Sequence, residues 1–260
     1  MPAPRAIGAV IVGDEILSGK RTDRHFANLR AALAPRGLVP AWVRYVGDDR
    51  PRLTDTLRET FATGEIVFCF GGIGATPDDH TRQAAAAALG RKLFRHPDAI
   101  REIEARFGAE AYPHRVMMGE FPEGSTIIPN PVNRIAGFRV ELDGGAHHFL
   151  PGFPDMAWPM FEWVMATYYA DVRAAVTQAE RAITVFDAGE SQLIPLMDTV
   201  VAAYPELKLF SLPRMLPDGG RRIELGVKGD ITRIDEALAR LESGVDALGF
   251  RREPGADRPV

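Results

Sequence analysis

Three acidic or glycine-rich segments of this 260-residue chain each follow a short apolar run. Asp14 and Glu15 come directly after residues 6–12, Asp48 comes after residues 38–46, and the segment 71–81 comes after residues 65–70. In an open parallel sheet, ligands bind beyond the carboxyl ends of the strands, so side chains in these three places converge. The repeated placement predicts a ligand site at this edge of a sheet.

The segment 71–81, GGIGATPDDHT, combines glycines with carboxylates. Gly71, Gly72 and Gly74 would let backbone N–H groups approach an anion closely. Asp78 and Asp79 would repel a phosphate in such a cradle, since two unit charges 4 Å apart oppose each other by roughly 4 kcal/mol near a protein surface. A divalent cation between carboxylate and phosphate resolves this conflict, and oxygen ligands favour Mg²⁺ or Mn²⁺ over zinc.

The same segment also has a purely structural interpretation. Thr76 as an N-cap, Pro77 at the first helical position, and Asp78 and Asp79 in the first turn are typical of the start of a helix. Local sequence favours the helix start and the ligand site about equally. The glycine content favours the ligand site, because a helix start does not require it.

The other two acidic segments differ in how well capping explains them. Asp49 fits the N-cap of a helix that carries Leu53, and this interpretation is about as good as a functional one. Asp14 and Glu15 directly follow a strand, and the apolar pair Ile16-Leu17 is too short to need a cap. A role in the site is therefore the better interpretation for Asp14 and Glu15.

The remaining reactive residue types give weaker signals. The single cysteine, Cys69, lies in an apolar run and is expected to be a buried, inert thiol. His147 and His148 are adjacent in a predicted strand and so face opposite sides. The spacing of the histidines is not typical of a metal site. We expect the histidines to lie at the surface or behind the residues that contact the ligand, and His80 is the one candidate for proton transfer. The aromatic and Met residues of 153–163 are expected in a core or an oligomer interface.

Hydrophobic periodicity predicts the elements that position these residues. Residues 6–12, 38–46 and 65–70 are strand-like, and helices with apolar spacings of three and four residues follow each of them. This alternation predicts an α/β fold with a doubly wound, mostly parallel sheet. The cluster Asp143-Gly144-Gly145 predicts a hairpin between 138–142 and 147–150 that extends the sheet. A helix from residue 154 to about 169 would close this domain.

The chain length and a change of pattern near residue 175 predict two domains. Residues 1–172 form the larger α/β domain, with 170–180 as the candidate linker. Residues 173–250 form a small α+β module with the order β-α-β-β-α: strand 181–186, helix 190–203, strands 207–212 and 221–228, and a helix from about 231 to 248. Residues 251–260 are expected to be a disordered tail.

Composition excludes several classes of function. Hydrophobic residues make up 46% and charged residues 25% of the chain, which is typical of a folded domain with a real core. The net charge is −4 and no basic stripe is present, so nucleic acid is not the expected partner. No signal peptide precedes the first strand and no apolar run reaches about 20 residues, so we expect a cytoplasmic protein without membrane contact.

The motifs described above together resemble those of a known protein family. The segment 71–81 resembles the Gly-Gly-x-Gly-x-Thr-x-Asp-Asp-x-Thr signature of competence/damage-inducible protein A (CinA) proteins, which MoaB/MogA-like molybdopterin-binding domains share in shorter form. Further matches over about residues 6–170 are GDEILSG at 13–19, VGDD at 46–49, PEG at 122–124, NP at 130–131 and LPGFP at 150–154. The small module resembles the KH-like domain of CinA proteins.

The resemblance implies roles for individual residues. Asp48 and Asp79 would hold Mg²⁺ or another divalent cation such as Mn²⁺. Asp14 and Glu15 would form a second polar wall of the site. All four residues are expected to be catalytic. The backbone of residues 71–76 would bind phosphate. The ligand-binding positions are expected to be Gly71, Gly72, Gly74, Thr76, Asp78, Thr81, Ser18, Asn130, Gly137, Pro151 and Gly152.

The family also implies alternatives for the activity. CinA proteins are associated with hydrolysis of ADP-ribose-type pyrophosphates, and the molybdenum branch with adenylylation of molybdopterin; both reactions are metal-assisted and centred on phosphorus. A protein that binds a small phosphorylated nucleotide or pterin without turnover is the third possibility, and the family commonly forms homo-oligomers, either dimers or trimers. Three departures from the family pattern bear on the ligand: Ala75 replaces the usual proline, Phe70 the usual small polar residue, and Asn133 with Ala136 replaces glycine and proline.

Overall fold

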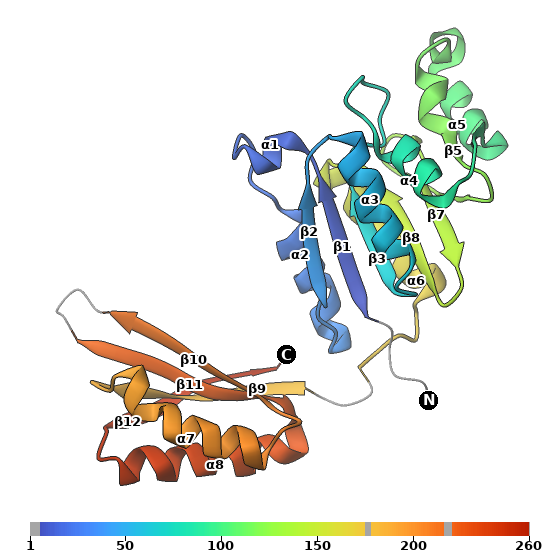
Figure 1. Ribbon diagram of the computed structural model, residues 1–260. Helices are drawn as coiled ribbons and strands as arrows, with labels where there is room; N and C mark the ends of the chain where they lie inside the picture. Colours follow the sequence, from blue (N-terminus) through green and yellow to red (C-terminus); the bar gives the residue numbers. More distant parts are fainter. Residues whose placement is uncertain (1–5, 175–177, 216–219, 260) are drawn as a thin grey trace. The chain divides into compact units, whose positions relative to one another are not determined.

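The computed structural model describes residues 6–174, 178–215 and 220–259. The chain forms two compact units, Met1–Leu33 with Val39–Val172 and Ala34–Leu38 with Arg173–Val260. Both units contain helices and a sheet (Figure 1). Each has its own cluster of buried apolar side chains.

The first unit is built on a six-stranded sheet in the order β2-β1-β3-β8-β7-β6 (Figure 1). The strands are β1 (Ile7–Val12), β2 (Trp42–Val46), β3 (Ile66–Phe70), β6 (Thr126–Ile128), β7 (Gly137–Leu142) and β8 (Gly145–Leu150). β2, β1, β3 and β8 are parallel, while β7 runs antiparallel to both β8 and β6. The predicted doubly wound sheet and the hairpin that extends it are confirmed.

Helices cover both faces of this sheet (Figure 1). On one face lie α3 (Arg50–Phe61) and α4 (Thr81–Leu89), which bury Leu53, Leu57, Ala84 and Ala85 against the strands. On the other lie α2 (His25–Leu33) and α6 (Pro154–Tyr168), where Phe161 packs on Phe68 of β3. Because β1 and β3 are covered on both sides, every residue in them is buried, as their continuous apolar sequences predict.

Shorter elements complete this unit. A one-turn helix α1 (Asp14–Leu17) follows β1, whereas the 3₁₀ turn η1 (Ala34–Arg36), which follows α2, belongs to the second unit. A small hairpin of β4 (Leu93–Arg95) and β5 (Glu120–Pro122) encloses α5 (Pro97–Phe107) and the 3₁₀ helices η2 (Gly108–Ala111) and η3 (Arg115–Gly119). This insertion contacts α4 through β5.

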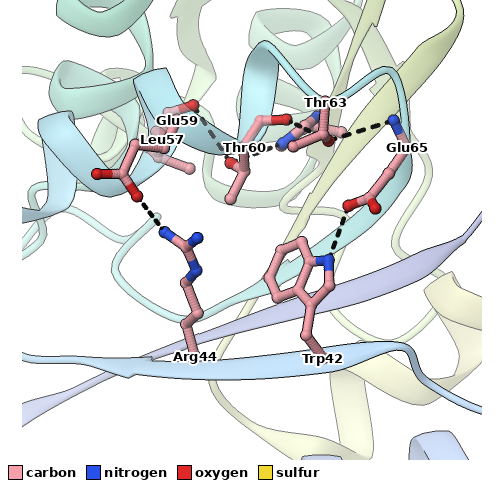
Figure 2. A network of polar contacts seen from close by, with 8 residues as sticks. Trp42, Arg44, Leu57, Glu59, Thr60, Thr63 and Glu65 are labelled. Carbon is pink, nitrogen blue, oxygen red and sulfur yellow. Dashed lines mark hydrogen bonds and ion pairs between the residues drawn. The ribbon is translucent and has the colours of Figure 1, made fainter.

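A network of polar contacts fixes the edge strand β2 to the turn between α3 and β3 (Figure 2). The Trp42 indole N–H donates to the Glu65 carboxylate at 2.7 Å, and Arg44 pairs with Glu59 at 2.5 Å. A Cβ atom at Gly8 would overlap the Trp42 ring, so only glycine lets the indole lie across β1. The register of β2 itself is set by its parallel pairing with β1, from Gly8 opposite Trp42 to Val12 opposite Val46.

The second unit is a four-stranded antiparallel sheet in the order β10-β11-β9-β12, with two helices (Figure 1). Its elements are β9 (Gln178–Phe186), α7 (Glu190–Ala203), β10 (Lys208–Met215), β11 (Arg221–Asp230), α8 (Ile231–Ala247) and β12 (Arg252–Pro259). Ile183, Leu225 and Val227 of the sheet pack with Ile234 and Leu241 of α8. The predicted order β-α-β-β-α is present and continues into a further strand.

Two expectations about secondary structure are wrong. Residues 252–259 of the expected disordered tail form β12, which pairs with β9 along most of its length, and residue 260 lies outside the described residues. The helix predicted to start near Thr76 begins only at Thr81, so the segment from Gly71 to His80 is a loop. Residues 175–177 of the predicted linker lie outside the described residues.

Candidate functional site

The predicted convergence of loops is present at the carboxyl ends of β1, β2, β3 and β8. The Gly13 N–H donates to the Val46 carbonyl at 3.0 Å, and the Gly71 N–H donates to the Leu150 carbonyl at 3.0 Å. These two bonds join the loops after β1 and β2, and those after β3 and β8. The strand order therefore brings the three acidic or glycine-rich segments to one edge.

Asp14 and Asp48 hold each other's loops. The Asp14 backbone N–H donates to Asp48 Oδ2 at 2.9 Å, and the Asp48 backbone N–H donates to Asp14 Oδ1 at 3.2 Å. A Cβ at Gly47 would overlap the Asp14 carboxylate, which explains the glycine there. Each carboxylate keeps a second oxygen that is not used in this exchange.

An acidic pocket forms around this pair. It is lined by Asp14, Glu15, Asp48 and Asp78, together with Leu17, Ser18 and Lys20. Burial raises the pKa of Asp48, and the negative charges of Asp14, Glu15 and Asp78 raise it further against the opposing hydrogen bond from Asp14. A bound cation would offset the repulsion that these three charges exert on the Asp48 carboxylate.

The glycine loop offers a row of free backbone donors. Throughout residues 6–174, 178–215 and 220–259, no acceptor is found for the N–H groups of Gly72, Ile73, Gly74 and Ala75. Gly72 has a φ of 68°, and a Cβ there would also overlap Thr81 Oγ1. Backbone N–H groups of a glycine-rich turn that lack a protein partner can donate to an anion.

The two adjacent aspartates of this loop have different surroundings. Asp79 Oδ2 accepts from the Thr76 backbone N–H at 2.8 Å and from the Thr76 hydroxyl, so Asp79 closes the turn 76–79. A Cβ at Gly74 would overlap the same carboxylate. Asp78 is exposed and lines the acidic pocket with Asp48. The helix-start interpretation of Thr76, Asp78 and Asp79 is wrong, whereas Asp49 does cap α3 by accepting from Arg52 N–H at 2.8 Å.

Beside the glycine loop lies a cleft of about 530 Å³, within the size range of small-molecule sites. Its other walls come from the loop after β8, from the loop before β7 and from Met118 of η3. The residues that line it include Glu15, Arg21, Gly72, Gly74, Thr76, Asp78, Asp79, Asn130, Asn133, Pro151, Gly152, Phe153 and Met156. Most of the predicted ligand positions therefore surround one cavity.

Three predicted ligand positions also have a structural role. The Thr81 side chain is buried and its hydroxyl donates to the Gly71 carbonyl at 2.9 Å, which anchors the glycine loop to α4. Gly137 lies within β7, where a Cβ would overlap the Phe149 carbonyl. The Asn130 amide accepts from Val132 N–H at 3.0 Å and donates to the Ile135 carbonyl, so it shapes its own loop at the rim of the cleft.

Sequence reasoning missed three residues near the cleft. Arg21 lines both this cleft and a neighbouring hollow of about 340 Å³. His25, 4% exposed, lines that hollow, stacks on Phe70 with ring centroids 4.4 Å apart, and contacts the Gly152 carbonyl at 3.1 Å. Arg82 is 1% exposed and contacts the glycine loop from below. The segment of residues 21–25 follows α1 directly, and its charged sequence was the signal available for Arg21.

The expectations for the other reactive residues have mixed outcomes. Cys69 is a buried free thiol whose pKa burial raises, as expected. His147 and His148 do face opposite sides, toward Thr60 of α3 and toward Tyr169, but both are buried and neither is at the surface. Phe153 is exposed and lines the cleft, so the aromatic segment 153–163 contributes to the site as well as to the core.

The carboxylates of the acidic pocket fit a magnesium ion that has few protein ligands. Among the residues that the structure describes, no group of three or more His, Cys, Asp or Glu side chains is arranged to hold an ion. Mg²⁺ is usually held by one or two carboxylates, with substrate phosphates and water completing its shell. Asp48 and Asp78 line one pocket and could supply these carboxylates.

The family model described as "Probable molybdopterin binding domain" matches residues 8–170. The chain belongs to this molybdopterin-binding-domain family. A CinA-like protein of Geobacter metallireducens is 30% identical over 259 residues, with 88% of this chain and 63% of the relative covered. A putative competence-damage inducible protein of Lacticaseibacillus paracasei is 32% identical over 197 residues, with 74% and 48% covered. The chain thus spans less than two thirds of the length of either relative.

A solved structure supports the same relationship. The CinA protein of Thermoplasma acidophilum, described as a protein with unknown function, aligns with a TM-score of 0.59 at 26% identity. The alignment covers 63% of this chain and 97% of that protein. This molybdopterin-binding-domain protein is therefore CinA-like in sequence and in fold. In the described part of the chain, no helix is both long and apolar enough to span a bilayer.

Proposed function

We propose that this CinA-like protein is a Mg²⁺-dependent pyrophosphatase that acts on a nucleotide of the ADP-ribose type. The observation that carries the proposal is the adjacency of two features. Four residues of the glycine loop that have free N–H groups line the cleft, and Asp78 and Glu15 line both this cleft and the acidic pocket. A pyrophosphate needs both donors for its oxygens and a counter-ion for its charge.

In this proposal the chain binds and orients the pyrophosphate through its backbone. The N–H groups of residues 72–75 hold one phosphate, and the walls formed by Pro151, Gly152 and Phe153 contact the organic part of the ligand. Asp48 and Asp78 would hold Mg²⁺, which would neutralise the negative charge on the phosphate oxygens. These two replace the pair Asp48 and Asp79 expected from the family resemblance, because Asp78 lines the acidic pocket together with Asp48 and Asp79 does not.

Glu15 is the proposed acceptor of the proton from the attacking water. Its side chain lines both the cleft and the acidic pocket, so it is near phosphate and near the metal carboxylates. The water oxygen forms a bond to phosphorus while the bridging P–O bond breaks, and the proton passes to Glu15. From ADP-ribose the products are AMP and ribose 5-phosphate. Asp14 acts by holding the Asp48 loop.

A second candidate is binding of a phosphorylated pterin, with or without transfer of an adenylyl group. The description of the family model favours it, and so does one contact. Asn133, which departs from the family pattern, donates to Met156 Sδ at 2.9 Å, and both residues line the cleft. This contact alters the wall that would face the organic part of a ligand.

One experiment tests these possibilities together. The purified protein is incubated with ADP-ribose and related dinucleotides, with Mg²⁺, Mn²⁺ or EDTA, and followed by ³¹P NMR. The proposal expects conversion of the pyrophosphate signals into two monoester signals only with a divalent ion. Line broadening without conversion would favour a binding protein without turnover. Absence of binding to every pyrophosphate tested would exclude the proposed activity and leave the pterin.

A further inference from the structure

The peptide between Gly74 and Ala75 is held from one side by a buried guanidinium. Arg82 of α4 donates from Nη2 to the Gly74 carbonyl at 2.6 Å, and from Nη1 to the Met117 carbonyl and to the Glu120 carbonyl at 3.4 Å. Burial lowers the pKa of Arg82, while the charges of Glu120 and Asp79 oppose that effect. A group with a pKa this high stays charged, so a cation lies beneath the glycine loop.

This contact fixes the direction of the next N–H group. The C=O and N–H of a trans peptide point in opposite directions. Because the Gly74 carbonyl points at Arg82, the Ala75 N–H points away from it. Ala75 lines the cleft, and no acceptor for its N–H exists in the part of the chain that the structure describes. A cation on the carbonyl also polarises the peptide and strengthens its N–H as a donor.

We infer that the Ala75 N–H is an anion donor of the cleft and that Arg82 is the positioning residue that aims it at the phosphate of the ligand. The inference rests on the proposed function, since it requires a phosphate in the glycine loop. It adds a donor that the CinA-type signature lacks, because proline, the usual residue at this position, has no N–H. The loop of this chain therefore binds one more phosphate oxygen than that signature provides.

Arg82 suits this role because its own position is over-determined. Its three carbonyl partners come from the glycine loop, from η3 and from β5, so the guanidinium joins two walls of the cleft. Met118, the neighbour of Met117, lines the same cleft. Lysine at this position keeps the charge but has no planar fork, so it can hold only part of this set.

The first test compares Ala75→Pro with Ala75→Gly by calorimetric titration of ADP-ribose in Mg²⁺. Proline removes the N–H and glycine keeps it, and circular dichroism with thermal melting checks that both fold. We expect Ala75→Pro to weaken binding about tenfold, as for a hydrogen bond to a charged group. Ala75→Gly should stay within about twofold of the parent. Adenosine, which has no phosphate, should bind equally to both.

The second test asks whether Arg82 acts through this N–H. Arg82→Lys alone should weaken ADP-ribose binding several-fold, whereas Arg82→Lys combined with Ala75→Pro should be no weaker than Ala75→Pro alone. In ¹⁵N-alanine-labelled protein, the Ala75 amide signal is assigned by its loss in Ala75→Gly. It should move downfield when inorganic pyrophosphate with Mg²⁺ is added, and move less in Arg82→Lys.

The outcomes separate the inference from the proposed function. If the parent binds ADP-ribose but Ala75→Pro and Ala75→Gly bind it equally, the Ala75 donor is overturned and the pyrophosphate site stands. If the two effects simply add in the double variant, Arg82 has only a structural role and its part is overturned. If the parent binds neither ADP-ribose nor pyrophosphate, the proposed function fails and the inference fails with it. If Arg82→Lys does not fold, the Ala75 pair and the amide signal still decide the donor.

Discussion

Replacement of Asp78 and of Asp79 by asparagine should have opposite consequences, although the two residues are adjacent. Asp78 is exposed and lines the acidic pocket, where its charge contributes to the raised pKa of Asp48. Asp78→Asn removes one of two proposed metal carboxylates but keeps a side-chain oxygen that can still accept a hydrogen bond from Thr76. The metal-dependent part of ligand affinity should therefore fall at least about tenfold, roughly 1.4 kcal/mol, with an unchanged melting temperature.

Asp79→Asn should instead act on the loop. Hydrogen bonds to a charged group contribute roughly 1.5–3 kcal/mol and neutral ones about half as much. Asparagine keeps a carbonyl acceptor for the Thr76 N–H, so the expected loss of stability is only about 1–2 kcal/mol. For a unit of this size, that corresponds to a fall in melting temperature of about 2–8 °C. Because the turn would be held less firmly, the N–H donors of the glycine loop should be less well positioned, and ligand binding should weaken by the same factor with and without metal.

Calorimetric titrations of ADP-ribose in Mg²⁺ and in EDTA, with thermal melts, distinguish the two variants. The informative quantity is the ratio of the two dissociation constants, because a folding defect changes both constants and leaves their ratio. We expect this ratio to collapse in Asp78→Asn and to persist in Asp79→Asn. If Asp79→Asn alone abolished the ratio, the reasoning from the acidic pocket would be refuted, and the pair Asp48 and Asp79 expected from the family resemblance would be restored.

Three further predictions concern pH and the end of the chain. Burial lowers the pKa of His147 and His148 from 6.5 to about 3. Below pH 6.5 the unfolded chain therefore binds more protons than the folded one. The free energy of unfolding is highest above pH 6.5 and decreases as the pH falls toward 3. At pH 4.5 the loss is about 2–3 kcal/mol per histidine, and urea midpoints against pH should show a shallower slope in His148→Phe than in the parent. The pKa of Asp48 is raised above its ordinary value of 3.8, so protons should compete with Mg²⁺ for this carboxylate. Metal-dependent binding should therefore start to decline, as the pH falls, at a higher pH than an ordinary aspartate would give. A pH-independent affinity down to pH 4 would contradict this. Deletion of residues 251–260 should lower the stability of the second unit, because β9 loses its partner β12; an unchanged urea midpoint would show that this strand contributes nothing.

Much of the fold could be predicted from local sequence. The apolar runs of β1 and β3, the glycine-containing turn between β7 and β8, and the cap at Asp49 depend on interactions between residues that are near in sequence. Strand periodicity, turn geometry and capping act over two to five residues, so they can be recognised without knowing the rest of the chain. The order of strands and helices then requires a parallel sheet, and that sheet implies where the ligand loops meet.

Only the tertiary structure decided how individual side chains at that edge are used. The sequence contains Asp78 and Asp79 side by side, but a loop replaces the expected helix turn, so one carboxylate closes the loop and the other lines the acidic pocket with Asp48. Arg82 could not be distinguished from a surface helix residue, because its three carbonyl partners come from segments up to 38 residues away. The burial of His147 and His148, and the pairing of residues 252–259 with β9, also depend on distant segments. Local patterns specify which elements form, whereas the environment of a side chain depends on contacts that exist only after these elements pack.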